Sequence, residues 1–252
     1  MFEGRVVVRS GPSAGWRLRL MQGFELAQEG RGVPLPLTAQ RVVALLAVVG
    51  RPLMREYVAG VLWPDSSETR ANGSLRSALW RLHRSARDTV VCSGQTICLA
   101  PHVTVDYHES LERAHRVLAR GGASADPSDS IDDPQAFSLE LLPDWYDEWL
   151  VAERERLRQL QLHALEHMSA HLRSRHSYGE AVEAAQLAVA FEPTRESARR
   201  ALIEAHLAEG NYAAAIREFI RFRDLLEREL GVEPSPMIQA LLPAGYAAGQ
   251  AT

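Results

Sequence analysis

The sequence contains no lysine, so all 28 of its basic side chains are arginines. It has only two cysteines, which are too few for a disulfide framework and fit a reducing cytoplasm. No apolar run reaches the length that a membrane span needs, and the first residues have no apolar core of signal-peptide length. These absences argue against an exported or membrane-spanning protein, and we expect a cytoplasmic one.

Catalytic motifs are equally scarce. GPSAG, at residues 11–15, matches the G-x-S-x-G pattern of a nucleophile elbow, but residues 16–26 alternate like a strand where that elbow needs a helix. His163, His167 and His171 have a spacing that could hold a metal, but no acidic or thiol partner completes a site, and packing at a helix edge is favoured. We expect neither an enzyme nor a cofactor, and a metal-dependent enzyme is the weakest alternative.

Charge divides the chain into two halves. Residues 1–120 contain 16 arginines and 10 acidic residues, a net charge of +6. Residues 121–252 contain 12 arginines and 22 acidic residues, a net charge of −10. A basic half joined to an acidic half indicates two domains with different partners. Residues 121–135 are rich in Gly, Ser, Asp and Pro, and are expected to form a loop.

The basic half has the pattern of a winged helix preceded by a small sheet. Alternation predicts strands, helical spacing predicts three helices, and two apolar runs around Ser93-Gly94-Gln95 predict a β-hairpin. The expected elements are strands at 16–26 and 33–37, helices at 39–49 (capped by Thr38), 55–62 and 69–87, and the hairpin at 90–99.

The third predicted helix has an apolar stripe on one side and arginines on the other. In a helix-turn-helix the second helix of the pair enters the major groove while its apolar stripe stays on the core. Arginine both pairs with phosphates and reads guanine edges. The alternative is an ordinary solvated basic face, but the preceding helix and the following hairpin favour DNA.

Candidate DNA-binding residues come from three places in this pattern. Arg51 and Arg55 stand at the entry to the second helix, and the hairpin tip is uncharged, so its contacts would be polar and weak. The full set is Arg51, Arg55, Arg70, Asn72, Ser74, Arg76, Ser77, Trp80, Arg81, Arg84, Ser93, Gln95 and Thr96. Cys92 and Cys98 lie on the two hairpin strands without further ligands nearby, so we expect them to be buried and reduced.

The acidic half reads as helices throughout. A connecting helix is predicted at 105–120, and everything from Ala136 onward has helical spacing. At an offset of 34 residues, Tyr178 aligns with Tyr212 and Ala181 with Ala215. That offset is the tetratricopeptide period, and small residues at equivalent positions let paired helices approach closely.

Four long motifs resemble the antibiotic regulatory protein (SARP) family of actinobacterial activators. GRGVPLPLTAQRVVALLAVVGRPLMREYVAGVLWPD and RANGSLRSALWRLHR resemble its DNA-binding domain. LLPDWYDEWLVAERERLRQLQLHALE and LLERELGVEPSP resemble its bacterial transcriptional activation domain. The resemblance covers residues 16–242. It implies a mainly α fold with a small β part: an OmpR-like winged helix-turn-helix followed by a tetratricopeptide-like all-α domain.

The resemblance also implies a function. Family members bind direct repeats in double-stranded promoter DNA near the −35 element and recruit RNA polymerase through its sigma factor and other subunits, which suggests control of a secondary-metabolite gene cluster. The recognition helix would be 70–84 and the wing 90–99. The loop implied to contact polymerase contains Trp63, Asp65, Ser66, Ser67 and Glu68.

The expected organisation is a flexible lead at 1–15, a DNA-binding domain at 16–105 and an activation domain at 106–252. Larger family members append further domains, so the chain is a small-type member or a fragment of a larger one. Self-association on DNA is expected, because a direct repeat suits two copies placed head to tail. The leading alternative is a tetratricopeptide adaptor whose winged helix binds protein and not DNA.

Overall fold

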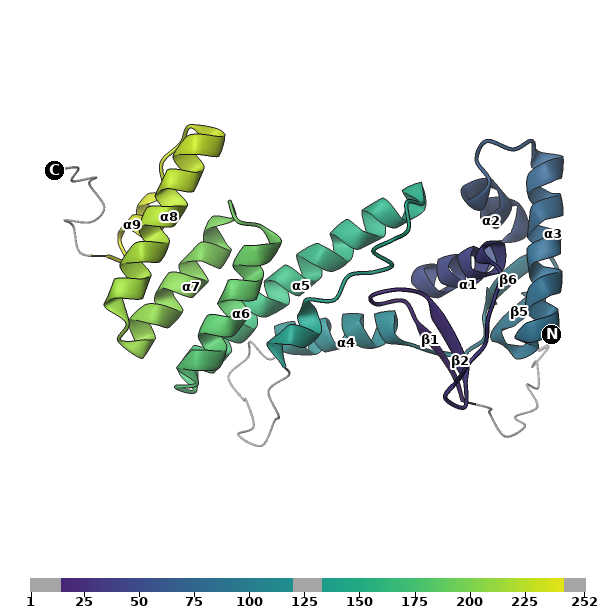
Figure 1. The fold of residues 1–252 in the computed structure, drawn as a ribbon, viewed down its shortest axis with the longest axis horizontal. Helices are drawn as coiled ribbons and strands as arrows, with labels where there is room; N and C mark the ends of the chain where they lie inside the picture. Colours follow the sequence, from purple (N-terminus) through teal and green to yellow (C-terminus); the bar gives the residue numbers. More distant parts are fainter. Residues whose placement is uncertain (1–14, 120–132, 243–252) are drawn as a thin grey trace, which may run out of the picture. The chain divides into compact units, whose positions relative to one another are not determined.

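The computed structural model describes residues 15–119 and 133–242, which form two compact units (Figure 1). The first unit comprises the chain up to Glu109 together with Glu140–Glu153, and the second comprises the remainder. Except for their last few residues, the lead expected at 1–15 and the loop expected at 121–135 lie outside the described residues. Mainly helical structure with a small N-terminal β region confirms the predicted fold class.

The first unit alternates short strands with three helices. One sheet has the strand order β3-β2-β1-β7; its first three strands come before the helices in the sequence and β7 comes after them. A second sheet, of order β4-β6-β5, contains the hairpin. The elements are β1 (Trp16–Arg19), β2 (Glu25–Gln28), β3 (Arg31–Gly32), α1 (Leu37–Val49), β4 (Leu53–Met54), α2 (Arg55–Leu62), α3 (Glu68–Ser85), η1 (Arg87–Thr89), β5 (Val90–Ser93), β6 (Thr96–Leu99) and β7 (Thr104–Val105).

Two predicted strands differ from the structure. The strand expected at 16–26 is two antiparallel strands, β1 and β2, because the chain reverses at Gln22 and Gly23, both of which have positive φ. Residues 33–36 of the strand expected at 33–37 form no strand, since the two prolines have no N–H for a ladder. Helix α1 begins at Leu37, with Pro36 as its extended N-cap (φ −63°, ψ 147°), and not after a Thr38 cap.

Helix α1 is the centre of the first unit. Val42, Val43, Leu45 and Leu46 point in different directions around it, yet each is at most 1% exposed. The helix is covered because α3, α2 and β6 all pack against it. Burial of this kind stabilises each large side chain by about 1.5–3 kcal/mol. A rigid central helix therefore holds α3 at the surface of the unit.

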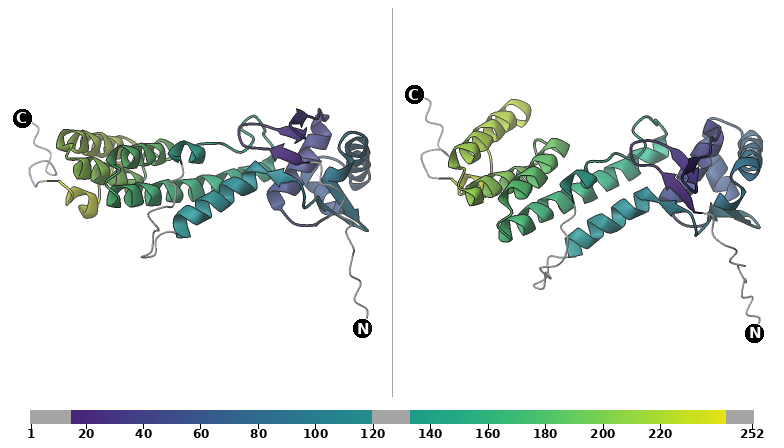
Figure 2. Two further views of the ribbon diagram at one scale, coloured as in Figure 1. Left: turned by 90° about the horizontal axis from the view of Figure 1, so that it is seen from below. Right: turned by 60° about the horizontal axis from the view of Figure 1, so that its bottom comes forward.

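The second unit is a succession of helices. The boundaries between the two units fall within its first two long helices, α4 and α5. The elements are α4 (Asp106–Ala119), η2 (Pro134–Phe137), α5 (Glu148–Ser174), α6 (Tyr178–Phe191), α7 (Glu196–Glu209), α8 (Tyr212–Leu230) and α9 (Pro236–Gln239). Helices α6, α7 and α8 pack in sequence order, each on the next (Figures 1 and 2). No described helix is long and apolar enough to cross a membrane.

The 34-residue offset corresponds to equivalent helix positions. Helix α6 begins at Tyr178 and α8 begins at Tyr212. Ala181 and Ala215, one turn into each helix, are completely buried. Because methyl side chains occupy these positions, the neighbouring helix can pack closely against each of them.

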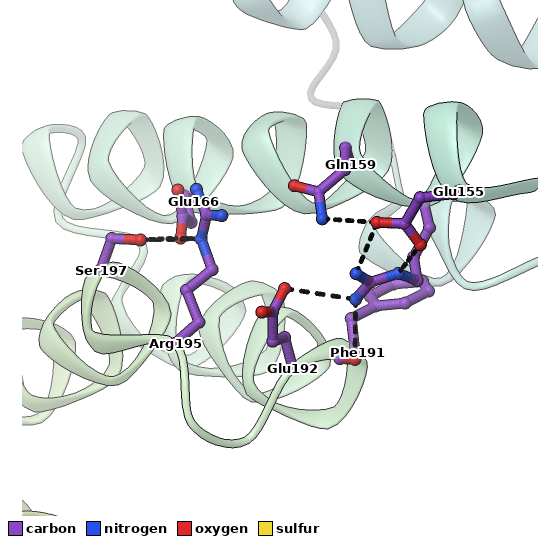
Figure 3. Close-up of polar contacts among 8 residues, drawn as sticks. Glu155, Gln159, Glu166, Phe191, Glu192, Arg195 and Ser197 are labelled. Atoms are coloured by element: carbon purple, nitrogen blue, oxygen red, sulfur yellow. Dashed lines mark hydrogen bonds and ion pairs between the residues drawn. The ribbon is translucent and has the colours of Figure 1, made fainter. Parts of the chain in front are cut away.

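Two polar networks join α5 to the α6–α7 connection (Figure 3). The Arg158 guanidinium donates to both carboxylate oxygens of Glu155 at 2.8 Å, to the Phe191 carbonyl at 3.1 Å and to Glu192 at 3.3 Å. In the other network, Glu166 accepts hydrogen bonds from the Arg195 and Ser197 side chains at 2.9 and 2.6 Å. These bonds satisfy the polar groups where α6 ends and α7 begins.

The Arg158 network gives the helical unit a measurable pH response. Hydrogen bonds from Arg158 and Gln159 lower the pKa of Glu155 to about 2. A lowered pKa in the folded state contributes stability above the unfolded value of about 4.5, and that contribution is lost as pH falls toward 2. We expect the stability advantage of the wild type over E155Q to shrink across this window. Urea unfolding at several pH values measures it.

The pH test needs a control, because many carboxylates titrate in the same window. E227Q removes an exposed glutamate from α8 and should keep a nearly constant difference from the wild type. Since Glu155 itself is exposed, its effect should be small and should weaken with added salt. A pH-independent difference between E155Q and the wild type would contradict the assignment.

Candidate nucleic-acid interface

Helix α3 has one buried side and one solvent-facing side. Its buried residues follow one another at spacings of four, three and four, which keeps them on one stripe. They are Ala71, Leu75, Ala78 and Leu82, each at most 3% exposed. Through this stripe α3 packs against α1 and α2. The rest of the helix surface is left to solvent, as the sequence predicted.

The solvent-facing side carries concentrated positive charge. Arg70, Arg76, Arg81 and Arg84 are all exposed, and within the part of the chain that the structure describes they form no ion pair. Three other arginines of the first unit are paired: Arg17 with Glu109, Arg19 with Glu25, and Arg41 with Asp147. Unpaired arginines also occur elsewhere in this unit, but α3 gathers four of them on a single helix.

Two of these arginines are held by neighbours. The Arg84 guanidinium lies 4.9 Å from the ring centroid of Trp80, a cation–π contact with a ring that is 59% exposed. The Arg81 side chain donates to Thr38 Oγ1 at 3.5 Å, at the start of α1. Arg84 therefore lies across the outward side of α3, whereas Arg81 lies on its flank toward α1.

A cleft of about 430 Å³ gathers candidates from three elements. Arg55 comes from the start of α2, Asn72 and Arg76 from α3, and Gln95 from the hairpin turn. The hairpin is fixed there because the Arg55 backbone N–H donates to the Gln95 carbonyl at 2.9 Å. Arg55 Nε is buried and has no acceptor among the described residues. This grouping, which joins positions 40 residues apart, places two guanidinium groups and two side-chain amides together, one of the amides at the hairpin tip.

The remaining hairpin candidates lie at its turn. Gly94 has a φ of +56°, which a tight turn requires and glycine tolerates. Ser93 and Gln95 are exposed, and Thr96 donates to the Ser93 carbonyl at 2.9 Å, which closes the turn. Arg51 is exposed in the connection between α1 and β4 and does not line the cleft.

The cysteines correct one expectation. Cys92 is exposed and Cys98 is half-buried, and both are free thiols. The prediction that both are buried was wrong for Cys92, and Cys98 is covered only in part. In this sheet β4 and β6 bury Leu53 and Ile97, whereas three of the four β5 residues are exposed and none is buried. Among the described residues, no group of three or more His, Cys, Asp or Glu side chains is arranged to hold a metal.

Gly73 lies on the polar side of α3 but was not among the predicted DNA-binding residues. It lies inside α3 on the side away from the core, and a Cβ built there would meet no atom within 4 Å. Ser74 is half-buried beside it, and the Ser77 hydroxyl, on the exposed side, donates back to the Gly73 carbonyl at 3.1 Å. A glycine in a helix interior costs about 0.5–1 kcal/mol relative to alanine. Its position in the helix was the signal that could have marked it.

The loop before α3 is short and structured. Trp63 ends α2, and the Ser66 N–H donates to the Trp63 carbonyl at 3.1 Å. Ser67 is the N-cap of α3, and Glu68 belongs to its first turn, where a carboxylate interacts favourably with the helix dipole. Of the five residues predicted for polymerase contact, the structure places Glu68 in the helix and not in the loop.

The second half of the chain matches a known family. The protein-family model described as the bacterial transcriptional activator domain matches residues 105–244, which is more than half of the chain. No curated protein matches the sequence significantly.

A solved structure has a similar fold. It is Mycobacterium tuberculosis EmbR in complex with a low-affinity phosphopeptide, with a TM-score of 0.63 and 18% sequence identity. The alignment covers 90% of this chain and 64% of the EmbR chain, so this chain spans less than two thirds of EmbR. At this identity the likeness concerns the fold alone. The family match agrees with the sequence motifs: the chain belongs to the bacterial transcriptional activator domain family.

Proposed function

We propose that this activator binds promoter DNA with the solvent-facing side of α3. The observation that carries the proposal is the set of four exposed arginines on α3 that have no ion-pair partner among the described residues. Phosphate neutralisation by such side chains supplies most of the affinity of DNA-binding proteins. Seated in the major groove, the helix would place these charges along the backbone on either side.

Base reading would come from the cleft beside α3 and from those outward arginines of α3 that reach base edges. Arginine pairs with guanine and asparagine with adenine through two hydrogen bonds each, so Arg76 and Asn72 have the chemistry to read base edges. Arg55, which lines the cleft at the start of α2, and the more distant Arg51 would contact phosphates. The hairpin turn at 93–96 would then lie over the neighbouring minor groove.

Activation would use other surfaces of the chain. The loop at 63–68 would contact RNA polymerase, and the acidic domain at 106–252 would mediate self-association on DNA. Two copies would bind a direct repeat head to tail, since symmetric dimers favour palindromes. The regulated genes would belong to a secondary-metabolite cluster, and the DNA-binding domain would span 16–105.

Selection from a random DNA library with the purified full chain, followed by fluorescence anisotropy across salt concentrations, tests DNA binding. The expected result is an enriched direct repeat whose affinity falls steeply as salt rises, because counterions are released from the DNA. Absence of salt-dependent binding would favour a protein-binding adaptor. An enriched inverted repeat would contradict the head-to-tail arrangement.

Replacing Gly73 with alanine is predicted to raise the stability of the fold and to lower the affinity for DNA. G73A should stabilise the fold by about 0.5–1 kcal/mol, because alanine is the better helix former and the new methyl meets nothing within the chain. The same methyl should weaken DNA binding several-fold, because it would separate the helix backbone from the groove floor. Thermal unfolding and anisotropy measure the two effects.

Gly60 is the matched control for this substitution. It also lies within a helix, α2, with no atom within 4 Å of a built Cβ, but it is away from the DNA-facing side of α3. G60A should stabilise the protein similarly and leave DNA affinity unchanged. If G73A binds the selected DNA as tightly as G60A does, close approach at Gly73 is refuted while DNA binding itself stands.

A further inference from the structure

A second cleft lies in the first unit, away from the DNA-binding candidates. Its volume is about 860 Å³. One wall is the end of α2 with the loop Trp63–Ser66, and the other is the segment Asp144–Trp149, which is distant in sequence. Leu37 and Arg41 from the start of α1 complete the lining. The cleft therefore includes most of the loop for which polymerase contact is proposed, and adds residues that no motif assigned to it.

The second wall is firmly anchored. Leu141 and Leu142 are at most 1% exposed, and the Leu142 N–H donates to the Leu20 carbonyl at 2.9 Å. Trp145 stacks on Phe24, with ring centroids 5.9 Å apart. The segment ahead of α5 is thus packed against the first sheet. Because it is held in place, the cleft is formed before any partner arrives, which reduces the entropy lost on binding.

The cleft has a net negative charge. Its charged lining residues are Arg41, Asp65, Asp144, Asp147 and Glu148. Arg41 forms an ion pair with Asp147, which neutralises both. The other three carboxylates are exposed and have no cationic partner among the described residues, so the cleft has a net charge of −3. This charge would repel the phosphates of DNA.

Aromatic rings accompany these carboxylates. Trp63, Trp145, Tyr146 and Trp149 line the cleft, and Tyr146 is 95% exposed. A fully exposed aromatic ring gains nothing from folding, so contacts within the described chain do not explain it. Ring faces attract cations, and arginine binds aromatic faces and carboxylates at the same time. The combination of rings and free carboxylates therefore suits a basic side chain and not a phosphate.

We propose that this cleft receives an arginine-bearing segment of RNA polymerase. The inference rests on the proposed recruitment of polymerase, and it adds to the 63–66 loop a second contact surface at 144–149. Carboxylates at Asp65, Asp144 and Glu148 would pair with the guanidinium groups, and Tyr146 would stack on one of them. Charge complementarity of this kind speeds association and rejects acidic partners.

Charge reversal tests the proposal in the full chain. RNA polymerase holoenzyme purified from an actinobacterium is immobilised, and its affinity for each variant is measured. We expect D144R/E148R to lose at least tenfold in affinity and Y146A to lose several-fold. Tyr146 is so exposed that its replacement should leave the fold intact. E227R, which reverses an exposed acid on α8, is the control and should bind like the wild type.

The outcomes separate this inference from the function on which it rests. All four proteins should bind the selected DNA equally, which shows that they are folded. If the wild type fails to bind polymerase, recruitment itself is refuted. If the wild type binds and D144R/E148R binds equally well, recruitment stands and the cleft proposal falls.

A photo-crosslinking amino acid at position 146 identifies the occupant. The expected crosslink is to a polymerase peptide that contains arginine, recovered by mass spectrometry from the complex on promoter DNA. A crosslink to DNA, to a second copy of the chain or to an acidic peptide would overturn the assignment.

Discussion

R84A is expected to weaken binding to the selected promoter DNA by about 1–3 kcal/mol, which is a loss of roughly 5- to 150-fold in affinity. Arg84 is exposed, forms no ion pair and lies over the outward-facing Trp80, so its guanidinium is already directed toward the proposed groove. The same range applies to R81A if it contacts a base. Because Arg81 lies on the flank toward Thr38, we expect R84A to have the larger effect.

Two measurements decide what each arginine contacts. Loss of a phosphate contact lowers affinity for all sequences alike and reduces the salt slope by about one, whereas loss of a base contact relaxes the preference at one position. R17A is the control, since Arg17 is also exposed but pairs with Glu109 on the sheet side of the unit. Wild-type affinity and sequence preference in both R81A and R84A would contradict the recognition role of α3.

E218A is expected to destabilise the helical unit by about 3–5 kcal/mol, because it leaves a buried guanidinium without its counter-ion. The Arg199 and Glu218 side chains are only 8% and 14% exposed, and their ion pair of 2.5 Å joins α7 to α8. The Arg199 guanidinium also lies 5.6 Å from the centroid of the buried Phe222 ring. Urea unfolding followed by helical circular dichroism measures the loss.

A second ion pair on α8 is the matched control. Arg228 and Glu229 are adjacent and mostly exposed, so E229A should change stability by at most about 1 kcal/mol. Replacing both buried partners, as in R199M/E218L, should restore most of the stability, because no charge is then left unpaired. If E218A proves no worse than E229A, the pair does not hold α7 and α8 together.

Local patterns in the sequence were sufficient to predict much of the fold. The three helices of the first unit were predicted within two residues at each end, because helix periodicity depends on neighbours three and four positions apart. The hairpin at 90–99 was predicted for the same kind of reason, since its turn residues are adjacent. The turn at Gln22 and Gly23 that divides residues 16–26 into β1 and β2 is also local, but alternation alone does not mark it.

The segment at 140–153 shows where local patterns fail. Its helical spacing and its motif assigned it to the second half of the chain, yet its contacts belong to the first unit. Leu142 pairs with Leu20, 122 positions away, and no local pattern encodes such a contact. The cleft beside it was invisible in the sequence for that reason.

By itself, the sequence determined that the chain has a basic and an acidic half, that α3 is amphipathic, and that arginines occupy its polar side. Side-chain identity and spacing are sufficient for these conclusions. Only the tertiary structure decided which arginines have an acidic partner and which have none. Arg17 and Arg41 are neutralised by acids 92 and 106 positions away, whereas those of α3 meet none within the described chain. Coulomb interactions act over a few ångströms in space, and only the path of the chain brings such residues together.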